Sequence, residues 1–162
     1  MPETPLIRRA TRADVPAIQS LLQEQASHHD ETLQAGPEAL ERYGFGPFTL
    51  FHCLLAERGA EALGFALYYP DFSTLRGRPG IMLQDIFVRP AARGLGLGRT
   101  LLTEVIADAR AWEAGFLTLM LDRHNASARA FYARHGFAPR GDYDLLILEG
   151  QGLTDLMAQE PG

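Results

Sequence analysis

The chain has 162 residues, of which 46% are hydrophobic and 22% charged, and its formal net charge is −5. This length and composition are typical of a globular protein with one core, so we expect a single domain over residues 1–162. The acidic charge argues against nucleic acid as the main partner and weakly favours cationic ligands. All 15 basic residues are arginine, which excludes a lysine base and a P-loop lysine in this chain.

Targeting and cysteine signals predict a cytoplasmic protein without a membrane partner. The N-terminal stretch MPETPLIRRA lacks the apolar core of a signal peptide, and no apolar run approaches the roughly 20 residues of a membrane span. The single cysteine, Cys53, excludes an internal disulfide and a multi-cysteine zinc site. It lies in the apolar run FHCLLAE, so we expect it to be buried.

The first part of the chain predicts a strand, two helices and a hairpin. PLIRRA has the pattern of a short strand, and Thr11, with Asp14 three residues later, is a candidate helix N-cap. The helix that follows has an apolar stripe of Val15, Ile18, Leu21, Leu22 and Ala26. Residues 37–43 predict a second, short helix. Two apolar runs joined by RGAE then predict antiparallel strands, TLFHCLLAE and ALGFALYYP.

A further strand and a long helix are predicted next. The apolar run GIMLQDIFV is typical of a strand, and a glycine-rich loop separates it from the helix. One apolar stripe of this helix consists of Leu101, Leu102, Val105, Ile106, Ala109 and Trp112. The helix should end before Gly115.

The C-terminal part predicts a strand, a helix, a strand and a helical turn. In chain order these are FLTLML, NASARAFYARHGF, DYDLLIL and LTDLMAQ. Asn125 is a good N-cap for the helix, and Gly136 suits its left-handed end. DYDLLIL is expected to close the sheet. The element order therefore predicts an α/β fold of the α+β type, in which helices cover both faces of a largely antiparallel sheet.

The segment RGLGLGRTLL places glycines at alternate positions where a helix begins, namely Gly94, Gly96 and Gly98. A Walker loop does not fit, because it needs a lysine, and the dinucleotide fingerprint needs a glycine where Arg99 stands. What remains is a loop that exposes the N–H groups of a helix N-terminus, where the dipole favours an anion. It is either a pyrophosphate cradle flanked by Arg93 and Arg99 or a plain strand-to-helix turn.

These residues resemble the signature loop of the GNAT acyl-CoA N-acyltransferases, whose Arg-x-x-Gly-x-Gly pattern spans Arg93, Gly96 and Gly98 here. The similarity extends over nearly the whole chain, because further segments follow in order the pattern of the diamine (spermidine/spermine-type) acetyltransferases. They are IRRATRADVPAI, YGFG, FHCLLAE, LGFALYYPDFST, LQDIFVRP and NASARAFYARHGF. The resemblance implies the GNAT fold, with a mixed, mostly antiparallel sheet of about six to seven strands, and a homodimer.

The resemblance also implies acetyl-CoA as co-substrate, with no metal, and assigns residues to it. The backbone of the glycine loop would hold the pyrophosphate, and main-chain groups of Ile86 and Val88 would pair with the pantetheine arm as an extra strand does. Tyr132 would be the general acid that protonates the departing thiolate. The full set of expected cofactor-binding residues is Ile86, Phe87, Val88, Arg93, Gly94, Leu95, Gly96, Leu97, Gly98, Arg99 and Asn125.

Gln84 and Asp85 are consecutive polar residues in an apolar strand, and we expect both to bind substrate. In a regular strand they would face opposite sides, so one would enter the core unless a β-bulge redirects it. The diamine acetyltransferases usually carry glutamate at the position of Gln84, and an amide cannot accept the proton that an attacking amine loses. Deprotonation would then fall to water, to Asp85 or to a histidine.

His28 and His29 complete the expected substrate-binding set. They stand where the family tends to have an aromatic–acidic pair that contacts substrate, and a solvated helix end is the alternative. A metal site at HHDE is a poor interpretation, because adjacent histidines on a helix diverge. His52 lies inside a strand and is expected to be a hydrogen-bonded structural histidine.

The resulting hypothesis is direct transfer of an acetyl group from acetyl-CoA to a primary amine of a small molecule. The expected amine is a polyamine, a diamine or a lysine-like amino acid. One alternative is an acetyltransferase for peptide N-termini or antibiotic amines. The other is an acyl-CoA-binding sensor that has lost its base, for which Gln84 is the best support.

Overall fold

The computed structural model describes residues 3–159, and one sheet has its strands in the order β1-β2-β3-β4-β5. The strands are β1 (Leu6–Arg9), β2 (His52–Arg58), β3 (Glu61–Ser73), β4 (Arg78–Val88) and β5 (Leu117–Leu119). β1 to β4 pair antiparallel, and β5 runs parallel to β4. The mixed, mostly antiparallel sheet confirms the prediction, but the 5 strands are fewer than the six to seven expected.

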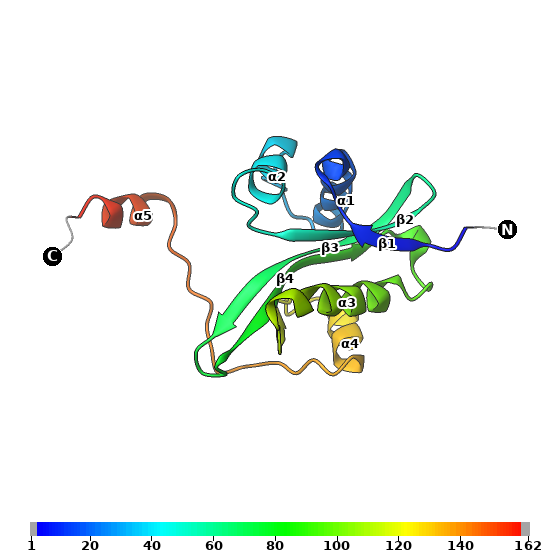
Figure 1. Ribbon diagram of the computed structural model, residues 1–162. Helices are drawn as coiled ribbons and strands as arrows, with labels where there is room; N and C mark the ends of the chain where they lie inside the picture. Colours follow the sequence, from blue (N-terminus) through cyan, green and yellow to red (C-terminus); the bar gives the residue numbers. More distant parts are fainter. Residues whose placement is uncertain (1–2, 160–162) are drawn as a thin grey trace. The chain divides into compact units, whose positions relative to one another are not determined.

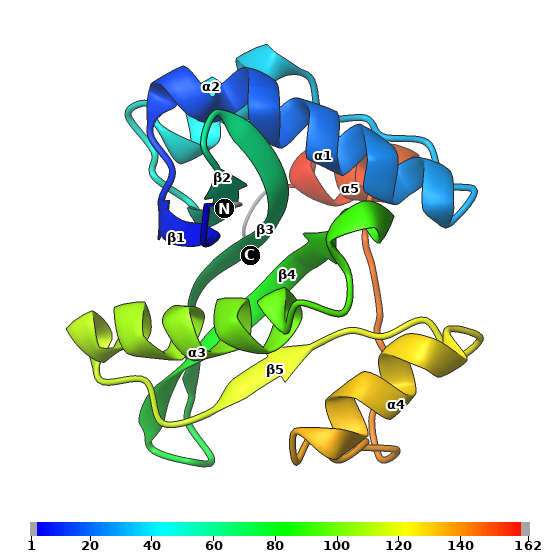
Figure 2. The same cartoon turned by 90° about the vertical axis from the view of Figure 1, so that its right-hand side faces the viewer.

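The helices are α1 (Val15–His28), α2 (Pro37–Gly44), α3 (Leu97–Asp108), α4 (Ala126–Arg134) and α5 (Gly150–Met157). The first three of them cover the two faces of the sheet. In Figures 1 and 2, α1 and α2 lie on one face and α3 lies on the other. None of the helices within residues 3–159 combines the length and apolarity that a bilayer-spanning helix needs.

The chain divides into two compact units, one up to Met120 and one from Leu121. The first unit contains the whole sheet together with α1, α2 and α3, and the second contains α4 and α5. The long apolar core therefore belongs to the first unit. That residues 1–162 act as one domain remains a prediction.

The face under α1 contains the larger hydrophobic cluster. The α1 stripe is buried as predicted, at Val15, Ile18, Leu21, Leu22 and Ala26. The first four pack with strand residues Leu55, Phe65, Leu67 and Phe87. Cys53 joins this cluster and is 3% exposed, so its predicted burial is confirmed, and that burial raises the pKa of its thiol.

The opposite face is covered by α3. Because side chains alternate along a strand, Leu54 and Ala66 point away from α1, and both are buried. The buried residues of α3 and the turn after it are Leu97, Leu101, Leu102, Val105 and Ala109. Ile106 belongs to the apolar stripe in the sequence but is 51% exposed. At about 100° per residue, Ile106 lies about 40° beyond Leu102, the outermost buried residue on that side, and so falls outside the buried face.

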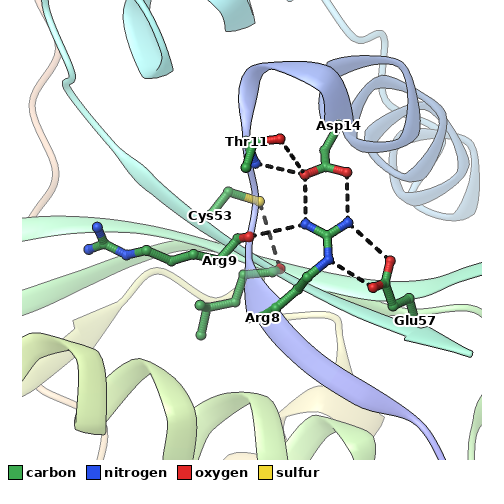
Figure 3. Close-up of polar contacts among 7 residues, drawn as sticks. Arg8, Arg9, Thr11, Asp14, Cys53 and Glu57 are labelled. Atoms are coloured by element: carbon green, nitrogen blue, oxygen red, sulfur yellow. Dashed lines mark hydrogen bonds and ion pairs between the residues drawn. The ribbon is translucent and has the colours of Figure 1, made fainter.

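One arginine fixes the start of the chain to the sheet (Figure 3). Arg8 on β1 donates two hydrogen bonds of 2.8 Å to Asp14, and its Nε donates one of 2.8 Å to Glu57 on β2. The N–H of Thr11 donates to the same Asp14 carboxylate at 2.7 Å, as a capping box requires. Hydrogen bonds from Arg8 lower the pKa of Asp14 to about 2. The predicted start signal at Thr11 is therefore confirmed, although a 3-10 turn at Arg12–Asp14 precedes α1.

The prediction that DYDLLIL closes the sheet is wrong. Residues 142–148 form no strand, and their large side chains are exposed, for example 89% at Leu146. The apolar pattern is that of a strand, but a strand forms only where a neighbour supplies hydrogen-bond partners. A helix near the C-terminus is confirmed, because α5 overlaps the expected turn and begins a few residues before it.

Candidate functional site

β4 has a neighbour on both sides along only part of its length. Its residues Ile81–Leu83 pair with β5, and from Asp85 to Val88 it pairs with β3 alone among residues 3–159. The N–H of Arg89 donates to the carbonyl of Leu63 on the β3 side at 2.8 Å. Because the direction of the backbone N–H and C=O groups alternates along a strand, every second residue before Arg89 also faces β3. The residues between them turn their N–H and C=O groups to the edge that has no neighbouring strand.

The residues that face this open edge are Ile86 and Val88. Their carbonyl oxygens accept hydrogen bonds from side chains and not from a neighbouring strand. Gln25 Nε2 donates to Ile86 O at 3.4 Å, and Arg93 Nε donates to Val88 O at 3.1 Å. An extended ligand that carries amide groups can replace these two bonds. Gln25 on α1 is a site residue that sequence reasoning misses, because it belongs to no motif and lies beside the apolar stripe.

The glycine loop follows β4 and leads into α3. Gly94 has φ 84° and Gly96, the N-cap of α3, has φ 73°. A Cβ at either position would have nothing within 4 Å, so the backbone conformation and not close packing requires glycine there. Gly98 already lies inside α3. The first N–H groups of α3 have no partner within the helix, so this loop has the chemistry of an anion site.

The side chains around the loop differ in exposure. Arg93, Leu95 and Arg99 are exposed, whereas Leu97 is buried. Phe87 is also buried, in the core cluster under α1. Phe87 turns its main chain toward β3 and its side chain into the core, so it offers neither to a ligand at the open edge. Leu97 can serve a ligand through its main chain alone, and the exposed side chains of Arg93 and Arg99 belong to the same loop.

Gln84 forms a β-bulge. Leu67 of β3 lies opposite Asp85, and the pairing shifts at this point so that Gln84 has no residue opposite it. The hydroxyl of Tyr69 donates to Gln84 Oε1 at 3.4 Å. Since Leu67 and Tyr69 are two residues apart, they share a face of the sheet, and the bulge directs both Gln84 and Asp85 to that face. The bulge that the sequence left open is therefore present.

Asp85 is partly buried on the face that α1 covers. Burial and, to a smaller extent, the negative charge of Glu31 together raise the pKa of Asp85 to about 6. No positive charge or hydrogen bond among residues 3–159 offsets these effects. A carboxyl group of this kind is ionised at neutral pH and still accepts a proton readily, as a general base must.

The end of α1 lies on the same side of the sheet. The His28 ring centroid is 5.7 Å from that of Phe87, two residues beyond Asp85, so the structure brings His28 toward the predicted site. His29 is an exposed residue at the C-cap of α1. Within the described part of the chain, no three His, Cys, Asp or Glu side chains come together as metal ligands.

A second aspartate, Asp108, lies at the end of α3 on the opposite face. Its Oδ2 accepts a hydrogen bond of 2.5 Å from the hydroxyl of Tyr68 and one of 2.8 Å from Arg9. Burial acts to raise the pKa of Asp108, but these hydrogen bonds outweigh it and the pKa is lowered. His52 Nδ1 lies 3.3 Å from the same Arg9 guanidinium, and its ring stacks on Trp112. The prediction of a structural histidine is thus confirmed.

Asn125 and Tyr132 belong to the second unit. Asn125 caps α4, because its Oδ1 accepts the N–H of Ala128 at 3.1 Å, and Gly136 ends the helix with φ 89°. Both predicted signals are confirmed. The ring of Tyr132 packs against Phe137, with centroids 5.2 Å apart. Their roles toward an acyl donor remain predictions.

Comparisons with known proteins find similar sequences and similar folds. The acetyltransferase (GNAT) family matches residues 15–137. Thialysine N-epsilon-acetyltransferase of Bos taurus is 36% identical over 110 residues, which are 62% of this chain and 64% of that protein. Spermidine/spermine N(1)-acetyltransferase-like protein 1 of Homo sapiens is 29% identical over 163 residues, 95% of this chain and 23% of that protein. A solved integron cassette protein from the mobile metagenome of V. cholerae has a TM-score of 0.80 at 22% identity, covering 96% of this chain and 98% of that one.

These similarities differ in what they establish. The solved structure shows the fold, and the bovine enzyme is matched over 64% of its length, less than two thirds. The family match covers residues 15–137, which include β4 with its open edge, the glycine loop and α4. The chain therefore belongs to the acetyltransferase (GNAT) family.

Proposed function

We propose that this protein transfers the acetyl group of acetyl-CoA directly to a primary amine of a small molecule and acts as one domain over residues 1–162. The observation that carries the proposal is the open edge of β4, which leads from Ile86 and Val88 into the glycine loop. Such an edge offers main-chain donors and acceptors to an amide chain, and the start of α3 offers N–H groups to a pyrophosphate.

The residues present fit acetyl-CoA, which supplies an acyl group activated as a thioester. Ile86 and Val88 would hold its amide chain once the bonds from Gln25 and Arg93 are replaced. Backbone N–H groups from Gly94 to Arg99 would hold its phosphates, with the freed Arg93 guanidinium beside them. The names of the relatives, a thialysine and a spermidine/spermine-type acetyltransferase, support a polyamine, a diamine or a lysine-like amino acid as acceptor.

The reaction requires two proton transfers. An alkyl ammonium of pKa about 10 is neutral in roughly one part per thousand at pH 7, which costs about 4 kcal/mol. As the amine nitrogen bonds to the acyl carbon and the carbon–sulfur bond breaks, the nitrogen loses a proton and the thiolate gains one. We assign the Asp85 carboxylate as the acceptor of the proton that the nitrogen loses and the Tyr132 hydroxyl as the donor of the proton that the thiolate gains. Gln84 shares the face of Asp85 and would position the amine or a water by hydrogen bonding.

The sensor alternative depends on the absence of a base at Gln84. Asp85 weakens that argument, because it is the next residue, points to the same face and has a pKa raised to about 6. Acetylation of peptide N-termini or antibiotic amines would use the same donor site. A panel of acceptors separates these possibilities.

The first experiment measures initial rates of CoA thiol release from acetyl-CoA. The panel contains putrescine, spermidine, spermine, thialysine, lysine and a peptide with a free N-terminus. We expect turnover concentrated on one small amine. Tight binding of acetyl-CoA with no turnover above hydrolysis on any acceptor would favour a sensor.

The role of Tyr132 has a separate test on the amine that gives the highest rate. Tyr132→Phe should lower kcat by roughly 10²-fold or more. Tyr43→Phe, at an exposed tyrosine of the first unit, is the matched control and should keep the wild-type rate. An unchanged kcat in Tyr132→Phe would remove this residue from the mechanism.

A further inference from the structure

Gln25 is a partly buried side chain at the open edge of β4, and only half of its amide group is used. Its Nε2 donates to Ile86 O at 3.4 Å, which is long for a hydrogen bond. Its Oε1 has no hydrogen-bond partner among residues 3–159. The carbonyl of Ile86 is the group that the amide chain of an acyl donor would use. Gln25 therefore occupies an acceptor that the donor needs.

The helix that carries Gln25 is fixed beside this edge by Arg89, the residue after β4. Arg89 Nε donates to the two carboxylate oxygens of Glu24 at 2.9 and 3.0 Å, and its Nη1 donates to the carbonyl of Ala62 at 2.5 Å. Since Glu24 is the neighbour of Gln25 in α1, this arginine links α1 to β3 and to the end of β4. A ligand can therefore reach Ile86 O through rotation of the Gln25 side chain alone, without movement of the helix.

Asp85, the residue before Ile86, offers a displaced Gln25 amide a new acceptor. Its side chain lies on the face that α1 covers, and its carboxylate accepts no hydrogen bond in the described part of the chain. The next turn of α1 also reaches this part of β4, because the ring centroid of His28 is 5.7 Å from that of Phe87. Gln25 and His28 are three residues apart and so share a face of the helix. The helix thus carries the amide on the side of the sheet where Asp85 lies.

We propose that Gln25 is a positioning residue that passes from the Ile86 carbonyl to the Asp85 carboxylate when the acyl donor binds. An amide N–H of the donor takes the carbonyl of Ile86, and the released Nε2 of Gln25 donates to Asp85. The donor thereby completes the acceptor site, because the carboxylate is held in one orientation only once the donor is in place. This inference rests on the function proposed above and adds a residue to it.

Such an exchange of partners predicts effects of opposite sign on donor binding and on acetyl transfer. The free protein holds Gln25 on Ile86 although Asp85 has no partner, so the passage to Asp85 costs free energy that donor binding must supply. Removal of the Gln25 amide should therefore tighten donor binding. Transfer should become slower, because Asp85 loses the hydrogen bond that orients it. A side chain that only supported the fold would make both processes worse.

Calorimetric titration with acetyl-CoA, without an amine, tests donor binding. Gln25→Ala and Gln25→Leu both lack the amide, both suit a helix, and only the second fills the volume. We expect each to lower the Kd for acetyl-CoA by about 2- to 10-fold, the range of one net hydrogen bond. Gln23→Leu, at an exposed position of α1, is the matched control and should keep the wild-type Kd. An unchanged or raised Kd in the Gln25 variants would overturn the inference, whereas a wild-type protein that does not bind acetyl-CoA would overturn the proposed function.

Rates of CoA thiol release at saturating acetyl-CoA test the passage to Asp85. The assay is run at about pH 8, above the Asp85 pKa of about 6, so that the carboxylate is ionised. With the preferred amine, kcat should fall roughly 10-fold or more in Gln25→Leu and stay at the wild-type value in Gln23→Leu. In an Asp85→Asn background Gln25→Leu should have no further effect, because the charged acceptor is already gone. An unchanged kcat in Gln25→Leu, or losses that add in the double variant, would contradict the inference.

Discussion

Asp85 and Asp108 lie on opposite faces of one sheet, and their carboxylates have different partners. Asp108 accepts hydrogen bonds from Tyr68 and Arg9, and its pKa is lowered. Burial, with a smaller contribution from the negative charge of Glu31, raises the pKa of Asp85 to about 6. Burial acts on both groups in the same direction, so the partners decide the outcome. The carboxylate that holds elements together stays ionised, whereas the one beside the bulge can exchange a proton near neutral pH.

The largest effect should appear in catalysis. Asp85→Asn removes the proposed proton acceptor, so kcat/KM for the preferred amine should fall by roughly 10²- to 10⁴-fold. Asp108→Asn is the matched control on the other face and should stay within a few-fold of wild type. Steady-state rates of thiol release measure both variants. Similar losses in the two variants would remove the distinction between the two aspartates.

Stability should move in the opposite direction for Asp85. Its folded-state pKa is raised from 3.8 to about 6, so the ionised carboxylate costs stability above that pH, and the cost disappears as the pH falls below the unfolded value. Asp85→Asn should therefore increase the free energy of unfolding by about 2–3 kcal/mol at about pH 8 and by little at about pH 4. Urea denaturation at the two pH values measures this. A destabilised variant at the higher pH would contradict the proposed cost of the charge.

Asp108→Asn should destabilise the protein. The amide no longer offers a charged acceptor to Arg9 and Tyr68, which link β1 and β3 to the end of α3. We expect a loss of about 1–3 kcal/mol in the free energy of unfolding at neutral pH. Urea denaturation with Glu113→Gln as an exposed control checks it. Stability equal to that of wild type would show that these hydrogen bonds contribute nothing net.

The smallest effect concerns the charge of Glu31. The acid limb of the pH profile of kcat/KM should lie at about pH 6, where Asp85 titrates. Glu31→Gln removes a negative charge that disfavours ionisation of Asp85, so this limb should move to lower pH by less than about one unit. Glu38→Gln, at an exposed position on α2, should leave the profile unchanged. A limb that does not move, or moves upward, would separate Glu31 from the titration of Asp85.

The structural predictions that depend only on residues close together in sequence are confirmed. The capping role of Asn125 and the left-handed conformation of Gly136 depend on a few neighbouring residues, and both are confirmed. DYDLLIL has the pattern of a strand, but its pairing depends on an edge elsewhere, which the pattern does not contain. The same limit applies to Ile106, whose exposure depends on how α3 is rotated against the sheet.

The candidate site shows a similar division. The polar pair Gln84 and Asp85 is visible in the sequence as an interruption of an apolar strand. Whether they share a face depends on the register between β3 and β4, and the pKa of Asp85 depends on Glu31, which is distant in sequence. Gln25 carries no sequence signal at all, and its place at the open edge follows from the packing of α1 on the sheet.

The open edge of β4 also has a consequence for amide hydrogen exchange. The N–H groups of Ile86 and Val88 face away from β3, whereas that of Arg89 is bonded to Leu63 and that of Phe87 points the same way as Arg89's. Fast and slow exchange should therefore alternate residue by residue along a single strand. A ligand that pairs with this edge would protect the fast set alone, so loss of the alternation reports occupancy of the edge without any measurement of turnover.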